Sequence, residues 1–217
     1  MDRQYVWTAQ LERAVLLRPG TSDAQVWDDV FLSGYHLPPA FTEMDPRVVL
    51  DLGANIGLTT AHYGAIWPEA RVVAIEMDKD NAVVARLNAP TSEVICCAVA
   101  ATIEAGSYDP DVSEQTYVFI PGGTTGQQVK AMTLAEIGEQ LTEIDFVKMD
   151  IEGTEWDILA KPTWAPFVNS LLVELHDRDG ARWPCPWLIE PAVGLLEDAG
   201  YHVSIHDTHP CAVWATR

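Results

Sequence analysis

The 217-residue sequence has few positively charged residues. It contains 13 lysines and arginines against 32 aspartates and glutamates, which gives a formal net charge of −19 at pH 7. A protein of that sign repels the phosphates of nucleic acids and the headgroups of anionic membranes. We therefore expect a partner that is neither nucleic acid nor membrane. Net charge bears on solubility and encounter, so it excludes functions without identifying one.

The sequence also lacks long apolar runs and any cysteine pattern. No run approaches the roughly 20 apolar residues of a membrane span, and the first twenty residues carry charges without the apolar core of a signal peptide. The 4 cysteines form neither a CxxC metal motif nor a spaced disulfide framework. These absences predict a soluble, cytoplasmic protein with reduced thiols.

Two glycines of a dinucleotide-binding motif are missing from a turn that otherwise suits a nucleotide. A motif starting at Gly53 would need glycines two and five residues later, where the chain has Asn55 and Leu58. Asp51, just before the turn, would repel a pyrophosphate but attract the ammonium and sulfonium cations of S-adenosylmethionine. Gly53 and Gly57 allow a tight turn and the close approach of a ligand. The turn therefore favours S-adenosylmethionine over a nicotinamide dinucleotide.

The next apolar run ends at Glu76, where a carboxylate can accept hydrogen bonds from both hydroxyls of a ribose. Both kinds of cofactor contain a ribose, so Glu76 indicates a nucleoside without specifying which. The alternative is an ordinary strand-to-helix turn followed by a solvated acid. The combination of turn and acid in register favours the cofactor.

Apolar runs and helical patterns alternate from residue 47 onward. This order predicts an α/β fold: a Rossmann-like, doubly wound, mainly parallel sheet of seven strands with an antiparallel C-terminal edge. Residues 93–100 read as its third strand, and residues 102–126 as an irregular crossover with one hairpin-like insertion. Residues 1–46 mix amphipathic stretches with turns and predict a helical cap or lid. We expect two units, 1–46 and a main domain of 47–217.

A second group of polar residues ends the fourth and fifth predicted strands. Lys148 and Asp150 lie on one face of a strand and Glu152 opens the following helix, while Glu174 and His176 end the next strand. The carboxyl ends of parallel strands meet at one edge, so these groups should converge there. His176 is the best candidate for a general base. Lys148 and Glu152 could instead form a structural ion pair at the helix start.

These motifs together resemble the FkbM family of methyltransferases over about residues 28–176. The family pattern has a VLDLGANIG-like first motif, a KxDxEGxE segment and a later strand ending in E-x-H. The chain supplies each of them at residues 48–57, 148–155 and 174–176. Two positions depart from the pattern: Ala135-Glu136 stands where an aspartate usually follows TL, and Met77 replaces a proline. Neither change removes a group that the chemistry needs.

The resemblance implies a class I, S-adenosylmethionine-dependent methyltransferase and a role for each motif. The acceptor would be a hydroxyl of a small molecule such as a sugar, polyketide or other specialised metabolite, which suggests natural-product biosynthesis. Asp150, Glu152 and His176 would line the methyl-transfer site, and Tyr35 would close over it. The residues expected to hold the cofactor are Asp51, Gly53, Asn55, Gly57, Glu76, Asp150 and Tyr35.

Several alternatives stay open at this stage. The substrate could be an amine or guanidine, the chain could be a non-catalytic cofactor-binding module, or it could be a nicotinamide oxidoreductase. Asp150, Glu152, Glu155 and His176 could ligate a metal, but carboxylate clusters are common and we assign none. The C-terminal histidines, His209 among them, read as surface or edge residues. Residues 183–187 follow the fifth strand, where substrate loops lie. A homo-oligomer is compatible with the sequence.

Overall fold

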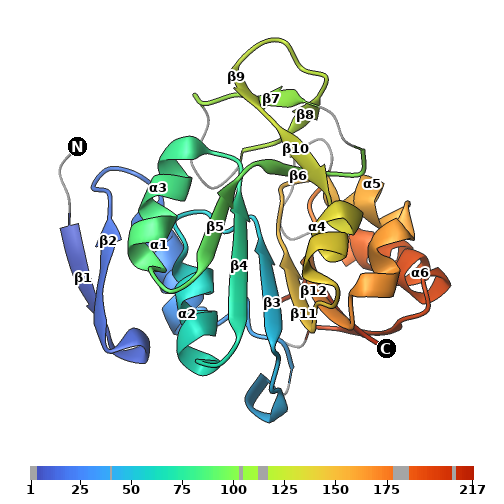
Figure 1. Ribbon diagram of the computed structural model, residues 1–217, viewed down its shortest axis with the longest axis horizontal. Helices are drawn as coiled ribbons and strands as arrows, with labels where there is room; N and C mark the ends of the chain where they lie inside the picture. Colours follow the sequence, from blue (N-terminus) through green and yellow to red (C-terminus); the bar gives the residue numbers. More distant parts are fainter. Residues whose placement is uncertain (1–3, 40, 103–104, 112–116, 178–185, 207–208) are drawn as a thin grey trace.

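The computed structural model describes residues 4–39, 41–102, 105–111, 117–177, 186–206 and 209–217. Its centre is a seven-stranded sheet in the order β13-β14-β12-β11-β3-β4-β5 (Figure 1). All neighbours pair in parallel except β14, which runs antiparallel to both β12 and β13. This confirms the predicted fold class. The strands are β3 (Val48–Leu52), β4 (Arg71–Glu76), β5 (Glu93–Cys96), β11 (Phe146–Met149), β12 (Ser170–Glu174), β13 (His202–Ile205) and β14 (Ala212–Thr216).

Alternating side chains of the central strands enter two different cores, as expected of a sheet that is covered on both faces. Leu50 and Leu52 of β3 join one core, and Val49 joins the other. The first core includes side chains from α4, α5, η4 and α6, and the second includes those from α2. The helices are α2 (Leu58–Ile66), α3 (Lys79–Asn88), α4 (Leu134–Leu141), α5 (Glu155–Leu159), η4 (Pro162–Phe167), η5 (Pro186–Leu188) and α6 (Ile189–Asp198).

Local capping explains where two of these helices begin. The Asp78 carboxylate accepts hydrogen bonds from the backbone N–H groups of Asp80 and Asn81 at the start of α3. Thr133 and Glu136 form a reciprocal capping box at the start of α4. Glu136 thus stabilises the start of α4 at the position where the chain departs from the family pattern.

The N-terminal segment begins with a hairpin, so the prediction of a helical segment over residues 1–46 is wrong for its first part. β1 (Gln4–Thr8) and β2 (Arg13–Leu17) pair antiparallel around η1 (Ala9–Leu11). Only then come the helical turns α1 (Asp23–Asp28), η2 (Asp29–Ser33) and η3 (Phe41–Glu43). Figure 1 shows the hairpin beside α3 at one end of the molecule.

Two anchors attach this segment to the main sheet domain. Val15 and Leu16 of β2 share a core with Ile56 of the glycine-containing turn and Val84 of α3. The Asn88 side chain accepts a hydrogen bond from the backbone N–H of Leu16 and donates one to its carbonyl oxygen. The segment therefore packs directly against the glycine-containing turn.

The predicted third strand is two strands that belong to different sheets. β5 ends at Cys96, whereas β6 (Ala98–Ala100) pairs in parallel with β10 (Ala131–Thr133). Between them, β7 (Gly106–Tyr108), β8 (Ile120–Pro121) and β9 (Gln127–Val129) form a three-stranded sheet. Figure 1 shows it beyond the carboxyl ends of β4 and β5. In the described parts of the chain, no helix has the length and apolarity needed to cross a membrane.

Candidate active site

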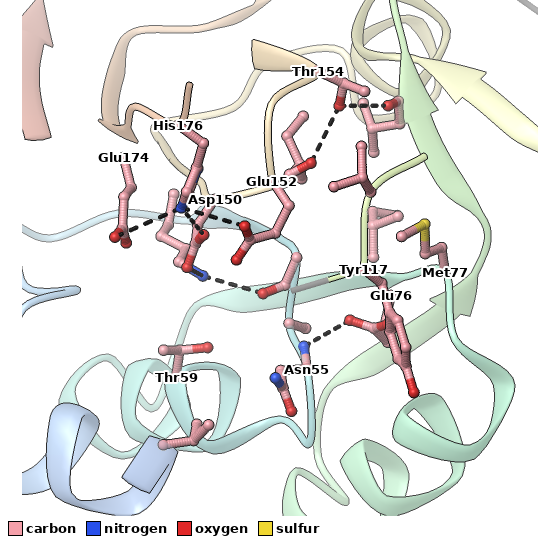
Figure 2. Close-up of a pocket in the computed structure, with 18 of the residues that line it drawn as sticks. Asn55, Thr59, Glu76, Met77, Tyr117, Asp150, Glu152, Thr154, Glu174 and His176 are labelled. Carbon is pink, nitrogen blue, oxygen red and sulfur yellow. Dashed lines mark hydrogen bonds and ion pairs between the residues drawn. The ribbon is translucent and has the colours of Figure 1, made fainter. Parts of the chain in front are cut away.

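A cavity of about 650 Å³ opens at the carboxyl ends of β3, β4, β11 and β12. This is the edge of an open α/β sheet at which ligands bind. The cavity brings together two groups of side chains from motifs that are far apart in the sequence (Figure 2). Two residues predicted for the site, Asp51 and Gly57, do not line it. The predicted residues that do line it are Tyr35, Gly53, Asn55, Glu76, Asp150, Glu152 and His176.

The glycines of the turn are required by packing within the protein. Gly53 has a φ of +76°, and a Cβ at this position would lie 1.7 Å from the carbonyl oxygen of Asp150. Gly57 has a φ of +77°, and its Cβ would lie 2.7 Å from Cα of Ala85 in α3. The sequence predicts that both glycines allow a tight turn and the approach of a ligand. Their positive φ angles agree with the tight turn. The structure adds a further reason for glycine, because Asp150 and α3 leave no room for a Cβ.

Asp51 is fully buried behind the turn and acts on the cavity through other residues. One carboxylate oxygen accepts hydrogen bonds of 2.6 Å from the hydroxyls of Thr59 and Thr60. The other lies 3.7 Å from the ammonium of Lys148. The charge of Asp51 suggested that it pairs directly with a cation of the cofactor. In the structure its carboxylate instead forms an ion pair with Lys148.

Lys148 is the buried cation that joins the two motifs. Its ammonium lies 3.0 Å from a carboxylate oxygen of Asp150 and donates a 3.1 Å hydrogen bond to the carbonyl of Gly53. Burial alone would lower the pKa of Lys148, but the charges of Asp150 and Asp51 raise it well above its ordinary value. Lys148 in turn lowers the pKa of Asp150 against the effect of burial. Both groups are therefore charged at neutral pH.

Glu76 lies on the other side of the cavity, 6% exposed. Its two oxygens accept 2.8 Å hydrogen bonds from the backbone N–H groups of Asn55 and Asp78. Burial raises the pKa of Glu76 to about 7 although these hydrogen bonds oppose the shift. Each carboxylate oxygen has a second lone pair, so the group can still accept hydrogen bonds from a ribose.

The surroundings of Glu76 fit a bound nucleoside. Met77, Ala98, Val99 and Phe119 line the same cavity and supply an apolar surface for a base. The carboxylates on the opposite side supply negative charge for the two cations of S-adenosylmethionine. The volume of the cavity, the carboxylate that can bind a ribose and the negative charge opposite it therefore all agree with this cofactor.

On the side of the cavity opposite Glu76, His176 lies among four carboxylates. Figure 2 shows Asp150, Glu152 and Glu174 around it. Its Nδ1 is 3.0 Å from a carboxylate oxygen of Glu155. Its Nε2 faces Asp150 and Glu152 at 3.7 Å and Glu174 at 3.8 Å. The convergence of the two strand ends, predicted from the sequence, is present in the structure.

Glu155 is a site residue to which the sequence argument gave no role beyond conceivable metal ligation. It is fully buried and accepts hydrogen bonds from the backbone N–H groups of Ile151 and Gly153 as well as meeting His176. This holds the turn in which Glu152 adopts a left-handed φ of 55°. Its place as the last glutamate of the KxDxEGxE segment is the sequence signal that could have identified Glu155 as a site residue.

The carboxylates determine the proton affinity of His176. Burial lowers its pKa, but the hydrogen bond to Glu155 and the charges of Glu155, Glu152 and Asp150 outweigh this and raise it to about 11. Burial and the charges of Asp150 and Glu155 raise the pKa of Glu152 to about 8, against the effect of His176. Without a ligand, His176 is therefore protonated at neutral pH. A base at this position must first lose that proton.

The N-terminal segment and the C-terminal turn complete the cavity wall. The Tyr35 hydroxyl donates a 3.4 Å hydrogen bond to Asp150, and burial followed by the charge of Asp150 raises its pKa, so it stays protonated. His209 is 7% exposed and its Nε2 lies 3.4 Å from Glu174. The expectation that His209 is a surface or edge residue is therefore wrong. Of the substrate-loop candidate 183–187, residues 183–185 lie outside the described residues.

The fold is similar to those of two fibrillarins. The fibrillarin pre-rRNA processing protein of Methanococcus jannaschii is 13% identical, with 99% of this chain and 81% of that chain covered and a TM-score of 0.52. Aeropyrum pernix fibrillarin, in complex with natively bound S-adenosyl-L-methionine, is 12% identical, with 85% and 74% covered and a TM-score of 0.50. At this identity the likeness shows the fold alone, that of the class I methyltransferases.

The particular family follows from the sequence match. The Methyltransferase FkbM domain matches residues 51–203, and the chain belongs to this family. Its cofactor is S-adenosylmethionine. No curated protein is significantly similar to the chain.

Proposed function

We propose that the protein transfers a methyl group from S-adenosylmethionine to a hydroxyl of a small molecule, such as a sugar, a polyketide or another specialised metabolite. The observation that carries this proposal is a single cavity with a nucleoside-binding side at Glu76 and a polar, charged side at His176. Its volume of about 650 Å³ is in the range of small-molecule sites. The net charge of −19 supports a small molecule over a nucleic acid.

The two sides have different tasks in this proposal. Gly53, Asn55 and Glu76 hold the nucleoside, with Glu76 binding the ribose hydroxyls. When bound, the cofactor supplies a methyl group made electrophilic by the positive sulfur. Asp150, at the junction between the sides, orients cofactor and acceptor, and Asp51 keeps Lys148 and the turn in place. Residues 1–46 act as a cap whose Tyr35 closes the cavity.

Methyl transfer requires alignment of the acceptor oxygen, exclusion of water and removal of a proton. Glu152 and His176 line the side of the cavity that this proposal assigns to the acceptor. In this proposal His176, whose Nε2 lies 3.7 Å from Asp150, receives the acceptor's proton. Because His176 already carries a proton in the ligand-free state, it can act only after positive charge enters the cluster and lowers its pKa.

A second candidate is methylation of an amine or guanidine. Asp29, Asp150, Glu152 and Glu174 all line the cavity, and such a wall would attract a cationic acceptor.

A paired activity screen tests both candidates. The full chain is incubated with radiolabelled S-adenosylmethionine and matched hydroxyl and amine forms of the same sugars and polyketides. Methylation of the hydroxyl member with an inert amine member supports the proposal. The reverse pattern would replace it with N-methylation, and binding of S-adenosylmethionine with no transfer to any acceptor would favour a non-catalytic module.

A further inference from the structure

We propose that Asp150, Glu174 and His176 form a binding site for one divalent transition-metal ion on the acceptor side of the cavity. This inference rests on the proposed function, because the ion would hold the acceptor oxygen. The three residues come from the ends of two adjacent strands, β11 and β12, and all three line the cavity. One atom from each residue, all within 4.8 Å of one another, could serve as a ligand.

The spacing of these atoms suits a shared ion better than hydrogen bonds. His176 Nε2 lies 3.7 Å from Asp150 Oδ1 and 3.8 Å from Glu174 Oε1. Both separations exceed a hydrogen bond, for which the limit is about 3.5 Å. Two ligands bound to one ion at roughly 2.0–2.2 Å stand about 3 to 4.4 Å apart. The observed separations lie within that interval.

The imidazole is already oriented as a metal ligand. Its Nδ1 is held at 3.0 Å by Glu155, which is fully buried and fixed by two backbone N–H groups. Among the described residues, Nε2 makes no hydrogen bond and points toward the cluster. A histidine whose second nitrogen is held by a carboxylate is the usual arrangement of metal-binding histidines. Glu155 is therefore the positioning residue of this site.

The charges also call for a cation at this point. Nε2 of His176 faces Asp150, Glu152 and Glu174, and its Nδ1 meets Glu155. The nearby Lys148 is engaged with Asp150 and Asp51. An ion on Nε2 would take the place of the ring proton there.

One nitrogen and two carboxylate ligands suit Mn²⁺, Fe²⁺ or Zn²⁺ better than Ca²⁺, which takes oxygen ligands. Three protein ligands leave coordination positions open for the acceptor. An acceptor hydroxyl bound there would lose its proton more easily. With Nε2 of His176 bound to the ion, the Glu152 carboxylate on the same side of the cavity would take that proton in place of His176.

Manganese binding to the full chain tests the site without relying on activity. Mn²⁺ is titrated into the protein while electron paramagnetic resonance records the free ion, and pulsed spectra record coupling to ¹⁴N of an imidazole. We expect one bound ion per chain with an imidazole signal. Glu174→Gln should weaken binding at least about tenfold, and His176→Gln should abolish the imidazole signal. Glu139→Gln, an exposed carboxylate on α4, is the control and should bind like the wild type.

Three outcomes would overturn the site: no bound Mn²⁺, binding without an imidazole signal, or affinity unchanged in Glu174→Gln. Circular dichroism checks that each variant folds, and Asp150→Asn substitutes for a variant that does not. Calorimetry with S-adenosylmethionine on the same samples separates the two proposals. If the wild type binds S-adenosylmethionine but no metal, the metal site is rejected and the proposed function stands. If the wild type does not bind S-adenosylmethionine, the proposed function is rejected.

Discussion

The two sides of the cavity differ in how completely the protein satisfies its own polar groups. On the cofactor side, both oxygens of Glu76 accept backbone hydrogen bonds of 2.8 Å. On the acceptor side, Nε2 of His176 faces three carboxylates at 3.7–3.8 Å without a hydrogen bond to any of them. The first side is organised by the fold before any ligand arrives. On the second side, the ring nitrogen that faces the cavity has no such hydrogen bonds.

The largest effect on activity should come from the acceptor side. His176→Ala should keep cofactor binding and lose about 10²–10⁴-fold in turnover, because the proton-accepting and orienting group is gone. Residual activity should rise with pH as solvent hydroxide takes over. Steady-state rates and calorimetry measure the two effects separately. His202→Ala, exposed on β13, is the control, and unchanged turnover in His176→Ala would exclude a catalytic role.

Among the substitutions considered, that of Lys148, which lies between the two sides of the cavity, should have the largest effect on stability. Lys148→Met removes the cation that lies beside both Asp51 and Asp150, and it leaves the fully buried carboxylate of Asp51 without its ion pair. We expect a loss of about 3–5 kcal/mol in the free energy of unfolding, measured by chemical denaturation. Lys161→Met, at an exposed site, should change it little. A loss below about 1 kcal/mol in Lys148→Met would contradict the role of Lys148.

The cofactor side depends on a turn that admits no side chain. Gly53→Ala combines a positive φ with a Cβ 1.7 Å from the carbonyl oxygen of Asp150. Gly122→Ala, at a φ of +66° in open space, isolates the backbone cost of about 1–2 kcal/mol. We expect the Gly53 variant to lose at least about 2 kcal/mol more than this control. Equal losses would show that the contact with Asp150 does not constrain the turn.

The smallest effect is a pH dependence of the cofactor side. Burial raises the pKa of Glu76 from 4.5 to about 7, so the folded state holds this proton where the unfolded state has lost it. The contribution of Glu76 to the free energy of unfolding should therefore fall as pH rises from about 4.5 to about 7. Cofactor affinity should rise over pH 6 to 8, because the carboxylate binds the ribose hydroxyls.

Glu76→Gln provides the comparison for both pH effects. The variant should become more stable relative to the wild type as pH rises from about 4.5 to about 7. Its cofactor affinity should vary less with pH than that of the wild type. Parallel profiles for wild type and variant would show that Glu76 does not titrate near neutrality.

The alternation of apolar runs with helical patterns, together with the glycine-containing turn, was sufficient to predict the central sheet. It also predicted that the polar residues at the strand ends lie close together. The runs ending at Asp51, Glu76, Asp150 and Glu174 are β-strands, and their carboxyl ends form one edge, as parallel order requires. The family could be predicted because each of its three motifs is a short stretch of sequence. All three motifs lie at this edge of the sheet.

Features that depend on tertiary packing were not predictable in the same way. The strand of residues 93–100 divides at Cys97 because β6 pairs with β10, a partner about 30 positions away. His209 becomes a cavity residue because the C-terminal turn lies against Tyr35 and Glu174. The charge of Asp51 was clear from the sequence, whereas its burial beside Lys148 was not.

The central claim is that one cavity joins a nucleoside site to an acceptor site in a methyltransferase. Isothermal titration calorimetry of the full chain with S-adenosylmethionine and with NAD tests it most directly. We predict stoichiometric binding of S-adenosylmethionine that is weakened in Glu76→Gln, and no binding of NAD. Binding of NAD alone would contradict the account.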